Sequence, residues 1–196
     1  PVFSWLFLRG RCRKCKAPIS PQYPIIEAAN GFLYVLVFAV NDFSLQSILY
    51  CLLMSALLVL SVIDWRTYEI PIGINIFILC LGILQVILDH TNWGDYVIGF
   101  LCVSIILEVL LLLSRGRAIG GGDVKLMAAA GLLLGWKKII LAFLLGCIIG
   151  SIIHLLRMKL SKADHVLAMG PYLSIGIAIA VLWGDALIRW YLGYLF

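Results

Sequence analysis

Charged residues are scarce in this chain of 196 residues. They make up 13% of the sequence, whereas soluble domains contain about 25%. Apolar residues make up 63%, and this composition excludes a soluble globular protein. A helix that crosses the hydrocarbon core takes about 20 residues, so several such helices leave no room for a sizeable soluble domain. We therefore expect an all-α, polytopic bundle of membrane helices.

The sequence lacks a disulfide framework, a nucleotide-binding glycine motif and a recognisable N-terminal start. Four of the six cysteines lie inside apolar runs, where Cys behaves as a small hydrophobe, so no disulfide framework is expected. No Gly-x-Gly-x-x-Gly motif follows a strand-like segment, which excludes a Rossmann-type nucleotide-binding unit. The chain begins at Pro1 without an initiator Met or a signal-peptide pattern, and we expect further residues upstream.

Seven apolar runs follow a basic segment at 1–23, in which three prolines prevent a continuous helix. The runs span 24–41, 46–63, 70–88, 96–114, 124–136, 137–156 and 166–184. We expect six or seven membrane helices and divide the chain into the segment 1–23 and a membrane domain at 24–196. The run 124–136 would be only about 20 Å long as a helix, so we expect a partly inserted half-helix there. Close helix packing is predicted at two Gly-xxx-Gly pairs, Gly131/Gly135 and Gly146/Gly150.

The net charge of +5 reflects the orientation of the chain and not a nucleic-acid partner. The loops at 1–23, 64–69, 115–125 and 157–165 hold 12 of the 15 Lys and Arg residues. Because cytoplasmic loops of membrane proteins carry an excess of Lys and Arg, these loops are predicted to face the cytoplasm. The lipid bilayer is the expected environment. The exceptions are Lys137, Lys138 and Arg189.

Two acidic residues stand at the ends of apolar runs. Asp64 follows the run 46–63, and Asp123 closes the sequence Ile-Gly-Gly-Gly-Asp. Two apolar crossings separate them, so the chain returns to the membrane face that it left and both carboxylates reach that face. Each residue alone also has a structural reading, Asp64 as a boundary acid neutralised by Arg66 and Asp123 as the N-cap of the next helix.

Two carboxylates brought together cannot both ionise cheaply, so one keeps its proton while the other acts as a base. This is the chemistry of an aspartyl protease. Gly120, Gly121 and Gly122 permit positive φ and close approach of another chain, as an extended peptide substrate requires. Lys125 would either hold a carboxylate charged or extend to the lipid headgroups.

The alternative is a proton-coupled transporter or channel in which the same acids form a relay. Transporters usually place such groups near the bilayer midplane and often contain repeated halves. Neither feature is evident in the sequence.

Four segments together resemble the bacterial type IV prepilin peptidases. They are PVFSWLFLRGRCRKCKAPIS at 1–20, DWRTYEIP at 64–71, GGGDVKLMAAAGLLLG at 120–135 and MGPYLSIG at 169–176. The resemblance implies a Gly-x-Gly-Asp protease of the bacterial inner membrane with Asp64 and Asp123 as the catalytic pair, facing the cytoplasm. Its substrates would be type IV prepilins or pseudopilins of type II secretion, which lose a basic leader. An archaeal relative acting on preflagellins is the second rival, against which the basic Cys-x-x-Cys segment argues.

The resemblance also implies two cofactors, neither of which proteolysis requires. Many members methylate the new N-terminus with S-adenosylmethionine. Members with a cytoplasmic zinc site carry a second Cys-x-x-Cys pair, which here would lie upstream of Pro1. Because structural zinc takes four ligands, Cys12 and Cys15 represent half of a site. The alternative is a pair of free thiols.

The remaining acids are weaker candidates. Glu108 lies about two-thirds of the way through its apolar run, and we expect a buried acid hydrogen-bonded to a neighbouring helix. Asp89, Asp95 and Asp185 fall on the opposite membrane face and are predicted to be solvated loop acids. Asp64 and Asp123 therefore remain the strongest candidates for catalysis.

Overall fold

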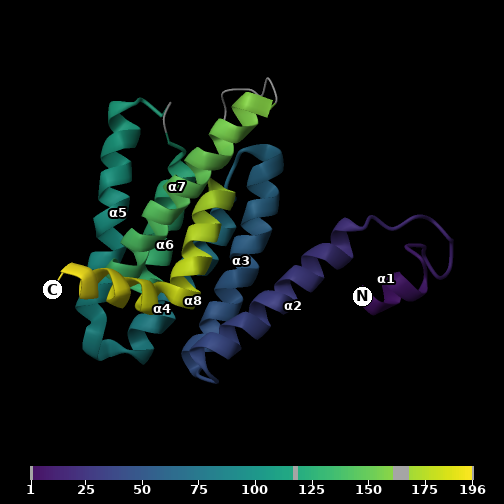
Figure 1. The fold of residues 1–196 in the computed structure, drawn as a ribbon, viewed down its shortest axis with the longest axis horizontal. Helices are drawn as coiled ribbons and strands as arrows, with labels where there is room; N and C mark the ends of the chain where they lie inside the picture. The colour runs from purple at the N-terminus through teal and green to yellow at the C-terminus, as the bar shows by residue number, and fades with distance from the viewer. Residues whose placement is uncertain (1, 117–118, 161–167, 196) are drawn as a thin grey trace.

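The computed structural model describes residues 2–116, 119–160 and 168–195 (Figure 1). These residues form helices and turns without a strand, apart from an isolated bridge between Arg11 and Pro18. The predicted all-α class is confirmed. The elements are α1 (Val2–Phe7), α2 (Gln22–Asn41), α3 (Leu45–Thr67), α4 (Ile72–Leu88), the 3-10 helix η1 (His90–Asn92), α5 (Trp93–Leu113), α6 (Gly121–Leu134), α7 (Trp136–Leu160) and α8 (Gly170–Leu195).

Helices α3 to α8 form a bundle in which consecutive helices run in opposite directions (Figure 1). Helices α3, α5 and α7 end at one end of the bundle, where α4, α6 and α8 begin. We call this the upper end, as drawn, and the opposite one the lower end. Helix α6 packs against α4, α5 and α7. The alternation brings three segments distant in sequence, around residues 64, 123 and 170, to the upper end.

Helix α6 is short and enclosed by protein. Its 14 residues correspond to about 21 Å, and nine of them are buried. Gly135 ends the helix with a φ of 80°. The predicted short helix is therefore present, packed inside the bundle. Five other described helices are long and apolar enough to cross a membrane, and α4 is slightly shorter, with 17 residues.

Small residues set the closest helix contacts. A side chain on either Gly99 of α5 or Gly131 of α6 would overlap the backbone of the other helix. Gly146 and Gly150 of α7 lie against the first turn of α8. These contacts confirm the close packing predicted at the Gly-xxx-Gly pairs.

The predicted end of the last run at Gly184 is wrong. Helix α8 continues to Leu195, and Figure 1 shows its C-terminal part (yellow) bending to run across the lower end of the bundle. The N-terminal segment 1–23 contains the short helix α1, and α2 begins at Gln22 with Pro24 in its first turn, where a missing N–H is tolerated.

Candidate active site

Both aspartates lie at the upper end of the bundle, each near a helix terminus. Asp64 is in the last turn of α3, which ends where Tyr68 takes a left-handed conformation and donates its N–H to the Asp64 carbonyl. Asp123 is in the first turn of α6. The reading of Asp123 as an N-cap is wrong, because Gly120 occupies that position and the helix begins at Gly121.

Both carboxyl groups are buried at the upper end of the bundle. Asp64 is 4% exposed and Asp123 is 8% exposed, and they are the only buried acids within the described ranges. The charge of Asp64 acts on Asp123, so the predicted pairing at one end of the bundle is present. Burying two like charges together is costly, and such clusters are characteristic of functional sites.

A backbone group from the far end of the sequence holds Asp64. The N–H of Gly170 donates a hydrogen bond to Asp64 Oδ2 at 2.9 Å. Since Gly170 opens α8, the Asp64 carboxylate lies at a helix N-terminus, where backbone N–H groups and the helix dipole stabilise negative charge. A Cβ on residue 170 would lie 2.7 Å from Oδ2, so a side chain there would displace the carboxylate.

Asp123 has one oxygen held and one unpaired. The backbone of Gly120 hydrogen-bonds the carboxyl group. Its Oδ1 is buried and has no hydrogen-bond partner within the described part of the chain. Buried acceptors in folded proteins nearly always have partners, so Oδ1 is available to accept a hydrogen bond or a proton.

Asn75 of α4 supports the turn that carries Asp123. The side chain is 5% exposed, and its Nδ2 donates to the carbonyl of Gly122 at 3.3 Å. A Cβ on Gly122 would lie 2.8 Å from the Cβ of Ile70. None of the glycines at 120–122 has a positive φ. They serve close approach of the chain and do not use the positive φ that glycine permits.

Sequence reasoning missed both Gly170 and Asn75. The segment containing Gly170 contributed to the family resemblance but gave no role for this residue, because its partner lies 106 positions away. For Asn75 a signal was available, namely a lone amide within an apolar run, since polar residues inside membrane segments are costly and usually functional.

Two other sequence candidates lie apart from the aspartates. Lys125 is exposed, and no ion pair joins it to either aspartate within the described residues. Glu108 is exposed on α5, so its predicted burial is wrong. The sequence around Glu108 is apolar on all sides and did not reveal which face of α5 packs inward.

The three acids predicted on the opposite face do lie at the lower end, but the prediction that all three are loop acids is wrong, because Asp95 lies in α5 and Asp185 lies in α8, which continues past Gly184. Hydrogen bonds from Thr91, Asn92 and Tyr96 lower the pKa of Asp89. Asp185 forms an ion pair with Lys138, and Asp95 lies in the first turn of α5. They are remote from Asp64 and Asp123.

A hollow of about 380 Å³ opens beside Asp64. Trp65, the neighbour of Asp64, and Pro171, the neighbour of Gly170, both line it. Gln22, at the start of α2, and Arg66 also line the hollow, and the Arg66 side chain donates a hydrogen bond to the Gln22 side chain. The hollow thus lies between the start of α2 and the helix ends that hold Asp64.

Cys12 and Cys15 lie in a tight loop outside the bundle, in which Cys12 N–H donates to the carbonyl of Ala17 at 2.9 Å. Hydrogen bonds from the backbone of Cys15 and Lys14 lower the pKa of the Cys12 thiol. The pair resembles half of a tetrahedral thiolate site. No group of three or more potential ligands occurs in the described part of the chain, so these residues do not fit a complete zinc site.

Comparison with known proteins identifies the family models that match the chain. The Type IV leader peptidase family matches residues 51–155, and the Bacterial Peptidase A24 N-terminal domain matches residues 1–41.

Curated relatives match nearly the whole chain. The prepilin leader peptidase/N-methyltransferase of Aeromonas hydrophila is 36% identical over 98% of this chain and 69% of the relative. The proteins of the same name from Stutzerimonas stutzeri and Legionella pneumophila are 34% and 30% identical, each over 99% of this chain and 70% of the relative. No solved structure matches.

Proposed function

Because the chain belongs to the Type IV leader peptidase family, we propose that it cleaves the leader from type IV prepilins or type II secretion pseudopilins with Asp64 and Asp123 as its catalytic pair. The observation that carries this assignment is the burial of two acids at the upper end of the bundle, where the charge of Asp64 acts on Asp123. The pair combines one buried carboxyl group at the end of α3 with one at the start of α6.

The pair performs peptide hydrolysis by sharing one proton. The ionised carboxylate takes a proton from water, which attacks the scissile carbonyl, while the protonated partner polarises that carbonyl and then protonates the leaving amine. The two aspartates can exchange these roles. The Gly170 N–H fixes the orientation of Asp64, and Asp123 Oδ1 is available to accept a proton. This hydrolysis requires no cofactor.

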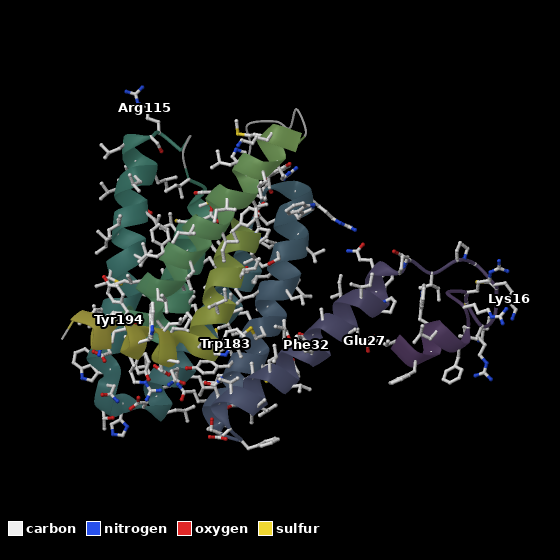
Figure 2. The ribbon with its side chains drawn as sticks, viewed as in Figure 1. Lys16, Glu27, Phe32, Arg115, Trp183 and Tyr194 are labelled. Carbon is white, nitrogen blue, oxygen red and sulfur yellow. The ribbon has the colours of Figure 1, made fainter. Side chains whose placement is uncertain are left out.

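The substrate reaches the pair from the cytoplasmic side of the bacterial inner membrane in this proposal. Arg66 lies in the last turn of α3, and Arg157 and Lys159 lie in the last turn of α7. Figure 2 shows the Arg115 side chain at the same upper end, and these cations support a cytoplasmic position for it. The basic leader then stays in the cytoplasm and the apolar segment of the prepilin lies in the bilayer. We assign the hollow beside Trp65 and Pro171 to the approach of the substrate chain.

A proton relay is the less favoured reading of the same acids. Transport relays place ionisable groups near the bilayer midplane, whereas Asp64 and Asp123 lie at one end of the bundle.

The names of the relatives also support N-methylation of the product. The described residues contain no strand and therefore no Rossmann-type S-adenosylmethionine site. We therefore assign no residue to methyl transfer. A product mass larger by one methyl group in the presence of S-adenosylmethionine is the test for this second activity.

The catalytic assignment is tested by Asp64→Asn and Asp123→Asn. Each change keeps the shape of the side chain but removes the acid or base, so each is expected to lower cleavage of a prepilin by about 100-fold to 10,000-fold. Product masses measured with purified protein report the cleavage, and thermal melting reports folding. Glu108→Gln, which removes an exposed acid, is the control and should keep near-normal activity. Near-normal turnover by either Asp variant would reject the pair.

A further inference from the structure

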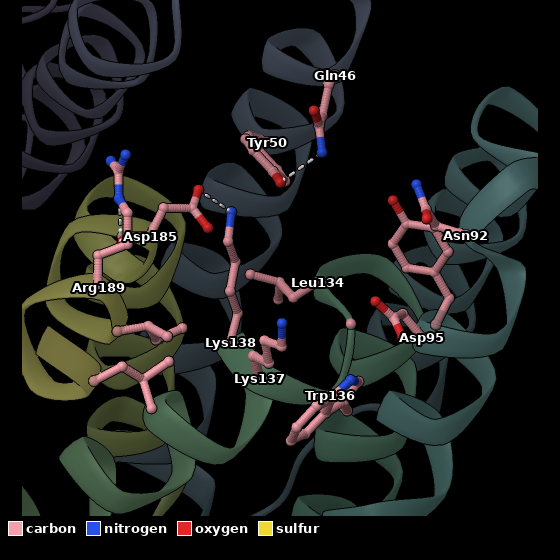
Figure 3. A pocket seen from close by; sticks show the side chains of 14 residues that line it. Gln46, Tyr50, Asn92, Asp95, Leu134, Trp136, Lys137, Lys138, Asp185 and Arg189 are labelled. Atoms are coloured by element: carbon pink, nitrogen blue, oxygen red, sulfur yellow. Dashed lines mark hydrogen bonds and ion pairs between the residues drawn. The ribbon is translucent and has the colours of Figure 1, made fainter. Parts of the chain in front are cut away.

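A polar pocket of about 710 Å³ lies at the lower end of the bundle, opposite the aspartates (Figure 3). Residues from α3, α5, α6, α7 and α8 line it. Three of them are Lys137, Lys138 and Arg189, the cations that the orientation argument left as exceptions. Figure 3 shows the side chains of Lys137 and Lys138 extending into the space between α8 and α5.

The pocket keeps cationic character despite the acids in it. Lys138 Nζ lies 2.7 Å from Asp185 Oδ2, and this pair is neutral. Lys137 is exposed, with its Nζ 5.5 Å from the centroid of the Trp136 ring. Arg189 donates from Nε to the backbone carbonyl of Asp185, and Figure 3 shows its guanidinium beyond Asp185, turned away from Lys137. Apart from the neutral Lys138–Asp185 pair, the pocket contains the cations Lys137 and Arg189 and one acid, Asp95, so its net charge is positive.

An apolar groove of about 450 Å³ adjoins the polar pocket. It runs between the first turns of α7, including Ile140 and Leu144, and the C-terminal part of α8. The two cavities share four residues, Trp136, Lys137, Ile188 and Leu192. A cationic pocket that opens into an apolar groove is complementary to an amphiphile with an anionic head and an acyl chain.

Aromatic residues place this surface at a membrane interface. Trp190, Tyr191 and Tyr194 are all more than half exposed on the bent C-terminal part of α8. Trp and Tyr concentrate where hydrocarbon meets the headgroups. The cationic pocket then lies at the level of lipid phosphates, and the groove lies along the acyl chains.

We propose that this surface binds one anionic glycerophospholipid. Lys137, which lines both the pocket and the groove, holds the headgroup phosphate beside the Lys138–Asp185 pair, and an acyl chain follows the groove past Ile140 and Leu144. Arg189 lies beyond Asp185 and adds positive charge at the rim of the pocket. Basic pockets between membrane helices are suited to acidic lipid headgroups. The site is separate from the catalytic pair and does not depend on the proposed peptidase function.

Native mass spectrometry of the purified chain tests this proposal. The protein is mixed with phosphatidylglycerol or with phosphatidylcholine carrying the same acyl chains, and the retained lipid is counted. Each Lys or Arg near a lipid surface contributes about 1 kcal/mol, a factor of about five. Lys137→Gln with Arg189→Gln should therefore weaken retention of phosphatidylglycerol by about 25-fold and abolish the preference over phosphatidylcholine.

Matched variants separate the site from general charge and surface effects. Arg13→Gln with Lys14→Gln removes the same charges from the exposed N-terminal segment and should retain the lipid as the unchanged protein does. Leu144→Trp fills the groove and should reduce retention. Leu112→Trp is the matched control on α5, where the Leu112 side chain is 68% exposed, and it should not reduce lipid retention.

Several outcomes would overturn the proposal. Equal retention of the two lipids, or an unchanged preference in the double variant, would reject an anionic headgroup site. Displacement of lipid by inorganic phosphate at equal concentration would assign the pocket to free phosphate. A dimer mass that falls to a monomer in the double variant, with no lipid retained, would assign the surface to a second copy of the chain.

Discussion

The two amides buried on α4 differ in the group that each holds. Asn75 donates to Gly122 beside the aspartates, whereas Gln85 donates to the hydroxyl of Tyr96 at the lower end. Asn75→Leu removes the donor that positions the turn before Asp123. We expect kcat for prepilin cleavage to fall by about 10-fold to 100-fold, because small displacements of catalytic groups have effects of this size.

Gln85→Leu is the matched control, because it removes a buried amide from the same helix. It should keep kcat near normal even if it lowers the melting temperature. KM should change little in Asn75→Leu, since Asn75 touches the protein backbone and not the substrate. Equal loss of kcat in both variants would show that Asn75 acts only through the stability of α4.

The hydrogen bond from Gly170 to Asp64 is also testable at a single residue. In Gly170→Ala the new methyl group would lie 2.7 Å from Asp64 Oδ2 and 3.0 Å from a methyl carbon of Leu60. The carboxylate has to move, and we expect cleavage to fall by about 100-fold. Gly193→Ala on the same helix meets nothing within 4 Å and should cleave normally. Normal cleavage by Gly170→Ala would remove this contact from the mechanism.

At the scale of helices, the junction between α4 and α6 depends on one glycine in the run of three. A methyl group at Gly122 would lie 2.8 Å from the Cβ of Ile70, whereas one at Gly121 would meet only the tip of Leu111 at 4.0 Å. Gly122→Ala should therefore push α6 away from the chain before α4 and lower cleavage strongly, while Gly121→Ala should be tolerated. Cleavage assays on the two purified variants decide this, and equal activities would contradict it.

The helices were largely predictable from the sequence, but their packing faces were not. Each long apolar run became a helix, because about 20 apolar residues in a bilayer have few alternatives to helical structure. The end of α8 was missed because the apolar run ends at Gly184 and Asp185, whereas the helix continues through them to Leu195. The exposure of Glu108 was missed because an apolar run without strong periodicity does not show which face packs inward.

The two acids of the candidate site were predictable from the sequence, but the residues that hold them in place were not. Asp64 and Asp123 interrupt apolar runs and return to one membrane face, and both facts can be read along the chain. The supports, Gly170 and Asn75, depend on contacts across the fold, one of them between residues 106 positions apart. Spacing along a sequence carries no information about such contacts.

For the whole molecule, the distribution of cations has a structural explanation. The upper end receives the termini of α3, α5 and α7 with their Arg and Lys residues, although residues 117–118 and 161–167 of the predicted cytoplasmic loops lie outside the described part. The three exceptions to the charge count are not scattered, because Lys137, Lys138 and Arg189 line one pocket. Their position therefore reflects a local site, and it leaves the predicted orientation of the bundle intact.

This orientation predicts which positions a membrane-impermeant maleimide reaches in a background without the six native cysteines. Thr67→Cys and Lys159→Cys lie at the upper end, after α3 and near the end of α7, and both are exposed. They should be labelled only when the cytoplasmic face is opened. His90→Cys lies at the lower end, between α4 and α5. It should be labelled on intact spheroplasts, in which only the periplasmic face of the inner membrane is accessible. Because Asp64 is three residues from Thr67, labelling of Thr67→Cys on intact spheroplasts would place the catalytic pair on the wrong face for a cytoplasmic leader. Labelling of Thr67→Cys and Lys159→Cys from opposite faces would contradict the bundle itself.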